Sequence, residues 1–103
     1  MIISGQGIEA LDESFDIVVA NMLLGEILEV GQELINKLNK DGRLILSGII
    51  SEQEDELRAC FANKLRLVTK KQEGEWITFI FKRKDEQAPK SRNQLLHLPK
   101  TSA

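Results

Sequence analysis

The feature that most constrains this sequence is the segment Phe15–Leu24, which reads FDIVVANMLL. Residues 17–20 are an unbroken run of small or β-branched apolar side chains, which is typical of a parallel strand buried on both faces. The run ends at Asn21, and the spacing of an amphipathic helix begins within three residues. Open α/β sheets bind ligands at the carboxyl ends of such strands, so we expect Asn21 to lie at a ligand site.

A helix is predicted to follow this strand. From Leu24 to Leu38 the apolar residues recur at the i, i+3, i+4 spacing of a helix with one face packed on a sheet. Gly31 falls on the same stripe, which suits either a close helix-to-sheet approach or a tolerated glycine. Residues 39–42 are expected to end the helix, with Gly42 taking the left-handed conformation of a terminal turn.

Residues 43–50 (RLILSGII) predict a second buried strand, which breaks into small polar residues at Ser47 and Gly48. A strand–helix–strand connection is right-handed and makes the two strands parallel neighbours. Their carboxyl ends then share one rim. We therefore expect Ser47 and Gly48 to lie beside Asn21.

A second helix is predicted after Ser51, which forms a capping-box pattern with Glu54. Cys60 lies on the apolar stripe of this helix, so we interpret it as a core residue rather than a reactive thiol.

Residues 65–69 and 76–82 (WITFIFK) predict two further strands, joined by a turn at 72–75 into an antiparallel hairpin. The second of these strands is mostly apolar on both faces, which places it inside the sheet. For Trp76 we favour core packing over contact with a substrate.

The composition changes after Lys84. Residues 85–103 contain both prolines and show no sustained period, so we expect one folded domain at 1–84 and a mobile tail at 85–103. A sheet of only four strands leaves the apolar strand at 15–20 on an open edge, and such edges promote association. We therefore predict self-association or pairing with a partner fragment along this edge.

Composition excludes several classes of protein. The net charge of −2 supplies no basic surplus for a nucleic-acid partner. The apolar runs are far shorter than the roughly 20 residues that cross a bilayer. One cysteine and one histidine exclude an internal disulfide and a Cys/His zinc site, which fits a reducing compartment. With no signal-peptide pattern after Met1, we expect a cytoplasmic protein without a membrane partner or a metal site.

Four segments in register make a family resemblance specific: FDIVVANMLL, DGRLILSGII, SEQEDEL and EGEWITFIFKRK. Over about residues 3–84 the chain resembles the C-terminal half of the ribosomal protein methyltransferase family PrmA. That family trimethylates amino groups of large-subunit ribosomal protein L-eleven with S-adenosylmethionine. The resemblance implies an α/β fold, namely the C-terminal half of a Rossmann-like class I methyltransferase sheet, with parallel strands, crossover helices and a terminal antiparallel hairpin.

The resemblance also implies roles for individual residues. Asn21 corresponds to the family asparagine that lies against the cofactor, at the position of the first residue of the (N/D)PP(Y/F) motif. Met22 stands where that motif has its first proline. Met22, Ser47 and Gly48 become candidates for the substrate rim. No residue is assigned as a certain catalytic group.

The chain lacks the family's glycine-rich loop and the acidic residue that binds the cofactor ribose. Gly5-Gln-Gly7 is not that loop, because no buried strand precedes it and no helical pattern follows it. At most one wall of the cofactor pocket is present. Two functions therefore remain: the C-terminal part of a methyltransferase, or a truncated or split non-enzymatic fragment that only associates with a partner or with itself.

Overall fold

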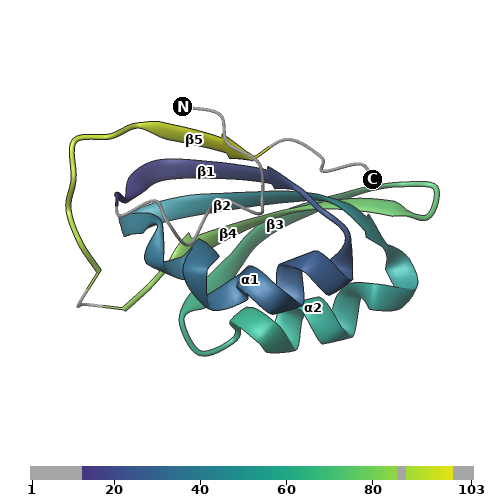
Figure 1. Cartoon of the computed structure of the whole chain (residues 1–103). Coiled ribbons are helices and arrows are strands. Elements are labelled where there is room, and N and C mark those ends of the chain that lie inside the picture. Colours follow the sequence, from purple (N-terminus) through teal and green to yellow (C-terminus); the bar gives the residue numbers. More distant parts are fainter. Residues whose placement is uncertain (1–12, 86–87, 99–103) are drawn as a thin grey trace.

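The computed structural model describes residues 13–85 and 88–98 and shows a mixed sheet with both helices on one face (Figure 1). Gly5 and Gly7 lie outside the described residues. The strand order is β3-β4-β2-β1-β5. The elements are β1 (Phe15–Asn21), α1 (Leu24–Asn36), β2 (Leu38–Ile50), the 3-10 turn η2 (Ser51–Gln53), α2 (Glu54–Phe61), β3 (Leu65–Glu73), β4 (Trp76–Arg83) and β5 (Leu95–Leu98).

The predicted α/β topology is confirmed. Strands β1 and β2 are parallel, with Val18 opposite Leu44 and Asn21 opposite Ser47. Strand β4 lies between β2 and β3 and runs antiparallel to both. The last predicted strand is thus inserted beside its neighbours, as the family resemblance implied.

Alternation along β4 explains why this strand lies inside the sheet. Ile77, Phe79 and Phe81 are buried against the helices, and the Phe81 ring lies 5.4 Å from that of Phe61 in α2. Trp76 points to the opposite face and is 53% exposed. The expectation that Trp76 packs in the core is therefore wrong.

The prediction that β1 is buried on both faces is also wrong. Val18 and Ala20 face the helices and are fully buried, whereas Ile17 is 38% exposed and Val19 is partly exposed. The reason is that α1 and α2 cover the same face of the sheet (Figure 1). Among the described elements no helix covers the other face.

Helix α1 ends at Asn36, earlier than its apolar stripe predicted, and β2 begins two residues later. Asp41, and not Gly42, takes the positive φ, at 61°. A Cβ on Gly42 would lie 2.8 Å from the Asn39 carbonyl oxygen and 3.1 Å from that of Phe15. Glycine is needed here because the backbones approach closely.

The carbonyl end of α1 is capped from a distant part of the sequence. The last turn of α1 has no basic residue, but Arg83 Nη1 donates to the carbonyl oxygens of Ile35 and Leu38, both at 2.8 Å. Arg83 Nε also donates to Asp85 Oδ1 at 2.7 Å. A buried cation therefore caps the Ile35 carbonyl in the last turn of α1 and ties it to the Leu38 carbonyl at the start of β2.

The predicted capping box at Ser51 does not form. Residues 51–53 make a 3-10 turn, and the Gln53 Oε1 atom accepts the Ile50 amide at 3.3 Å. Glutamine therefore fills the role expected of Glu54, one residue earlier in the chain. Glu54 instead accepts from Lys70 Nζ at 2.8 and 2.9 Å.

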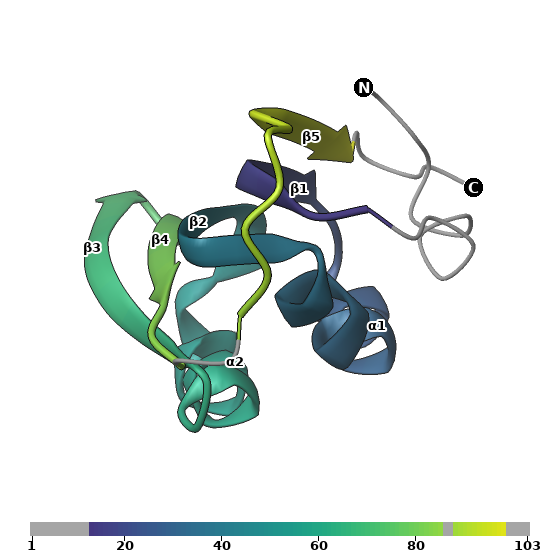
Figure 2. The same cartoon turned by 90° about the vertical axis from the view of Figure 1, so that its left-hand side faces the viewer.

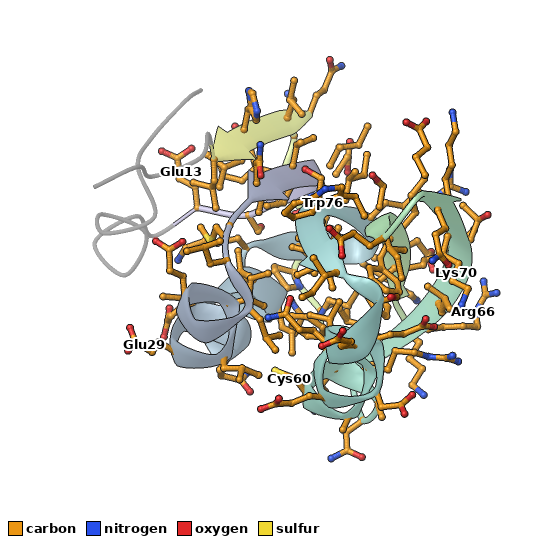
Figure 3. The ribbon with its side chains drawn as sticks, turned by 90° about the vertical axis from the view of Figure 1, so that its right-hand side faces the viewer. Glu13, Glu29, Cys60, Arg66, Lys70 and Trp76 are labelled. Atoms are coloured by element: carbon orange, nitrogen blue, oxygen red, sulfur yellow. The ribbon has the colours of Figure 1, made fainter. Side chains whose placement is uncertain are left out.

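Cys60 is exposed, so its assignment to the core is wrong. Its sulfur lies between α1 and α2 (Figure 3). A Cβ on Gly31 would lie 2.9 Å from Cys60 Sγ, so the glycine serves the contact between the two helices rather than contact with the sheet. Partial burial raises the pKa of the Cys60 thiol, which disfavours the reactive thiolate at neutral pH.

The edge of β1 is covered, contrary to the prediction of an open edge. Strand β5 pairs with β1 in parallel, with Ile17 opposite Leu95 and Ala20 opposite Leu98. This strand comes from the segment for which we expected a mobile tail, because a strand of four residues is too short for its alternation to be recognised in the sequence. Residues 86–87 and 99–103 of that segment lie outside the described part of the chain.

Candidate functional site

The carboxyl ends of β1, β2 and β5 meet at one rim, because the three strands are parallel. Figure 3 looks onto this end of the sheet. Asn21 and Ser47 lie opposite each other in the register, one residue beyond the pair formed by Ala20 and Leu98. The parallel pairing therefore brings together two of the predicted site residues.

Gly48 places the Asn21 side chain. Gly48 has a φ of 92°, and a Cβ added to it would lie 2.9 Å from Asn21 Oδ1 and 3.3 Å from the Met22 carbonyl oxygen. The β2–β4 register shifts between Leu46 and Ile49, so Ser47 and Gly48 form an irregularity in β2. Such irregularities redirect side chains next to functional sites, and this one leaves space for the Asn21 amide beside Gly48.

The Asn21 amide is available to a ligand. Its residue is partly exposed, and its side chain makes no hydrogen bond to any other residue of the ranges 13–85 and 88–98. An asparagine offers one carbonyl acceptor and two N–H donors from a single group. Asn21 can therefore both accept from and donate to a bound molecule.

Met22 and Ser47 contribute differently to the rim. The Met22 side chain is 1% exposed and belongs to the core, so its backbone carbonyl is the atom that it offers beside Gly48. Ser47 is partly exposed, at the last pair between β1 and β2. Asn21 and Ser47 therefore contribute side chains to the rim, and Gly48 contributes the space beside Asn21. Met22 contributes only its backbone carbonyl.

Two apolar side chains at the same end of the sheet were not assigned to the site from the sequence. Trp76 pairs with Ile50 beyond the β2 irregularity and is 53% exposed, and Leu23, which follows β1, is 54% exposed. Exposed large apolar side chains next to convergent polar groups are typical of binding sites. The alternation of β4 was the available signal for Trp76, because it placed this residue on the opposite face from Phe79.

Two further findings bear on the kind of site. Within the described residues, no group of three or more His, Cys, Asp or Glu side chains could hold a metal ion. No helix in the same part of the chain is long and apolar enough to cross a membrane.

Comparison with known proteins gives a consistent result. The sequence profile of the family described as ribosomal protein L11 methyltransferase (PrmA) matches residues 2–84. The ribosomal protein L11 methyltransferase of Pelobacter propionicus is 38% identical over 77 residues, which are 74% of this chain and 25% of the relative. That of Campylobacter concisus is 40% identical over 76 residues, which are 74% of this chain and 27% of the relative.

Solved structures agree with the sequence match. The crystal structure of ribosomal protein L11 methylase from Lactobacillus delbrueckii subsp. bulgaricus matches with a TM-score of 0.71 and 33% identity, over 76% of this chain and 41% of that chain. The M1.HpyAVI–SAM complex matches with a TM-score of 0.60 over 96% of this chain and 69% of that chain, and its 9% identity shows a shared fold alone.

The chain spans about a quarter of the length of the curated relatives that it matches. The profile nevertheless covers every described element from β1 to β4. The family profile, the sequence identity and the structural match all agree, and the chain belongs to the ribosomal protein L11 methyltransferase (PrmA) family.

Proposed function

We propose that this chain is the C-terminal portion of an S-adenosylmethionine-dependent protein methyltransferase that acts on amino groups of a large-subunit ribosomal protein. The observation that carries the proposal is the Asn21 amide, partly exposed beside Gly48 at the carboxyl rim of parallel strands, in a chain of this family. Ligands of open α/β sheets bind at this rim. We also infer a cytoplasmic location from the ribosomal substrate.

The residues at the rim fit one wall of a cofactor site. The space that a Cβ on Gly48 would fill is taken by the Asn21 side chain, and the Met22 carbonyl lies alongside it. When bound, S-adenosylmethionine supplies an activated methyl group. The acceptor and donor atoms of Asn21 suit the polar parts of such a molecule, while the rest of the pocket would have to come from another polypeptide segment.

Methyl transfer to an amine depends mainly on position and on the exclusion of water. The Asn21 Oδ1 atom can accept an N–H of a neutral amine and so orient the nitrogen lone pair. Ser47 offers a hydroxyl at the same rim, and the exposed Trp76 ring, opposite Ile50, offers an apolar surface at the same end of the sheet. None of these roles requires a nucleophile from this chain.

A complementation experiment tests the proposal. The chain would be mixed with the separately produced N-terminal part of the Pelobacter propionicus relative, and transfer of a labelled methyl group to ribosomal protein L11 would be measured. We expect transfer only when both parts are present. The same mixture with Asn21→Ala should be strongly impaired. Absence of transfer by a folded, associated pair would contradict the proposal.

Calorimetry of the chain alone with S-adenosylmethionine tests the single-wall interpretation. We expect weak binding or none, because one wall leaves most of the cofactor in water. A dissociation constant in the low micromolar range would show that this chain forms more of the pocket than its rim suggests.

A second candidate function is a non-enzymatic fragment that keeps the fold and only associates with a partner or with itself. The observation that favours it is β5, which already occupies the edge of β1 within the chain. Under this alternative the chain would be folded and stable, yet it would give no methyl transfer with any complementary part of a relative.

A further inference from the structure

A buried asparagine at the opposite end of the sheet holds the C-terminal segment. Asn39 is 2% exposed. Its Oδ1 atom accepts from Ser14 Oγ at 2.7 Å and from the Ser91 amide at 2.9 Å. Its Nδ2 atom donates to Asp16 Oδ1 at 2.9 Å and to the carbonyl oxygens of Ser91 and Asn93 at 3.2 and 3.4 Å. One amide thus joins β1, β2 and the segment that leads into β5.

The backbone continues this attachment along β1. The Asp16 amide donates to the Asn93 carbonyl at 3.0 Å, and the Ile17 amide donates to the Gln94 carbonyl at 2.8 Å. The Ser91 hydroxyl donates to the Ser14 carbonyl, and the Asn93 side chain donates to the same oxygen at 3.1 Å. The segment is therefore in register before β5 begins.

Two leucines anchor β5 on the helix-covered side. Leu96 and Leu98 are fully buried, whereas Leu95 on the opposite face is 47% exposed. The segment is thus held in three ways: by the hydrogen bonds of the Asn39 amide, which we call the polar clamp, by parallel backbone pairing with β1, and by the buried side chains of Leu96 and Leu98. These are the components by which a peptide adds as a strand to an exposed sheet edge.

The docked segment lies outside the family portion of the chain. The family match ends at residue 84, and residues 88–98 follow it. Every residue that receives the segment, including Ser14, Asp16 and Asn39, lies within the family match. The receiving edge therefore lies within the family portion, and its occupant lies outside the matched range.

Residues 88–94 lead into β5 across the amino ends of β2 and β1 (Figure 2). The Lys40 amide donates to the Pro89 carbonyl at 2.7 Å, and Asn39 bonds to backbone atoms of Ser91 and Asn93. The position of β5 is therefore set by contacts of this segment with β1 and with the start of β2.

We propose that the edge of β1 and the Asn39 amide form a docking site for an extended strand, and that residues 88–98 are its separable occupant. The site recognises a serine and an asparagine two residues apart, followed by apolar residues on alternate positions, as in Ser91, Asn93, Leu96 and Leu98. A segment of this chemistry binds in trans when the resident segment is displaced. The resident segment therefore competes with any other strand for β1.

The test uses the full chain with Leu96→Asp and Leu98→Asp, which undock β5, and Leu95→Asp as the matched control on the exposed face of the same strand. The binding partner is a fluorescein-labelled peptide of residues 88–98, followed by fluorescence anisotropy. Because the docked segment leaves few sites open, we expect the peptide to bind the double variant about tenfold or more tightly than the wild type or the control. Equal binding to all three would overturn the proposal.

Asn39→Ala in the undocked chain tests the polar clamp. We expect roughly tenfold or greater loss of peptide affinity, because several hydrogen bonds are removed. Asn36→Ala, at an exposed amide of α1, is the matched control and should leave the affinity unchanged. Equal affinity of the two variants would remove Asn39 from the site.

A further variant covers failure of the double aspartate variant to fold, as judged by circular dichroism. Ser91→Ala with Asn93→Ala removes the side-chain hydrogen bonds from the segment to the Ser14 carbonyl and to Glu13, and leaves the backbone bonds to Asn39 in place. This weakened docking should also increase peptide binding over the wild type. No increase in a folded chain would overturn the proposal. The assay involves no methyl transfer, so its failure is distinct from failure of the proposed function.

Discussion

Two asparagines lie at opposite ends of this sheet and differ in what surrounds the same side chain. Asn39, near the amino end of β2, is 2% exposed, and both polar atoms of its amide are hydrogen-bonded. Asn21, at the carboxyl end of β1, is partly exposed and makes no side-chain hydrogen bond within the described ranges. One amide is saturated by the protein, and the other, which we propose binds a ligand, has no side-chain partner among the described residues.

The difference shows how to separate structural from ligand-binding polar groups. A buried polar group that loses its partner costs about 1–3 kcal/mol, so a saturated amide is tied to stability. A partly exposed amide can exchange water for a ligand at little cost to the fold. The sequence predicted Asn21 at the end of a buried strand and placed Asn39 in the turn that ends the first helix, and only their hydrogen-bond partners in the structure distinguish their roles.

The largest expected effect is that of Asn39→Ala. The change leaves the Ser91 amide and the Ser14 hydroxyl without their acceptor and loosens the segment that leads into β5. We expect a loss of about 3 kcal/mol, which is roughly 10–20 °C in melting temperature for a domain of this size. Thermal unfolding followed by circular dichroism measures it.

Asn36→Ala is the control for that change, because the Asn36 amide makes an exposed bond with Gln32. The control should lower stability by less than about 0.5 kcal/mol. Equal melting temperatures of Asn39→Ala and Asn36→Ala would show that Asn39 has no special role in stability.

The next effect concerns Gly48, which gives the Asn21 amide its room. Gly48→Ala adds a Cβ that would lie 2.9 Å from Asn21 Oδ1, at a φ of 92°. We expect a loss of about 2 kcal/mol from strain and steric overlap together. Thermal unfolding measures the loss.

Gly74→Ala separates the two causes. Gly74 also has a positive φ, of 63°, but a Cβ there would meet nothing within 4 Å. We expect about 1 kcal/mol from backbone strain alone. Equal losses at the two glycines would mean that contact with Asn21 contributes nothing.

The amino end of the sheet carries a second structural polar group, the pair of Arg83 and Asp85. The Arg83 hydrogen bond, together with the Arg83 and Lys64 charges, holds the pKa of Asp85 below its ordinary value. The stability from this ionised carboxylate is therefore complete above the ordinary aspartate pKa and is lost as pH falls through the lowered value. Asp85→Asn should cost about 1 kcal/mol at pH 7 and progressively less below about pH 4.

Asp55→Asn is the control, at an exposed position in the first turn of α2. Chemical denaturation at pH 7 and at pH 3 measures the two variants against the wild type. If Asp85→Asn lowered the free energy of unfolding equally at pH 7 and pH 3, the contribution of Asp85 would come from packing rather than from its charge.

The family portion of the fold could be predicted from the sequence because its signals are local. The apolar run of β1, the stripe of α1 and the alternation of β4 lie in elements of seven, thirteen and eight residues. Strand β5 has four residues, and what fixes it is the bonding of Ser91 to Asn39, 52 residues away. Pairings of that kind leave no periodic trace in a sequence.

The candidate site divides in the same way. The shared rim of Asn21 and Ser47 followed from strand order, which the sequence pattern indicates. The close approach of Gly48 to the Asn21 amide depends on a shift of register in β2, and no pattern in RLILSGII marks it. The helix cap by Arg83 was missed for the same reason, since donor and acceptors are 45 and 48 residues apart.

The smallest expected effect on stability is that of Asn21→Ala, and it is the counterpart of Asn39→Ala. The Asn21 amide is partly exposed and supports no other described side chain through a hydrogen bond. We therefore expect a change in unfolding free energy below about 0.5 kcal/mol. In the complemented methyltransferase, loss of one positioning hydrogen bond should lower methyl transfer by roughly 10–100-fold. Unchanged transfer would remove Asn21 from the ligand site, and a melting temperature as low as that of Asn39→Ala would make both asparagines structural.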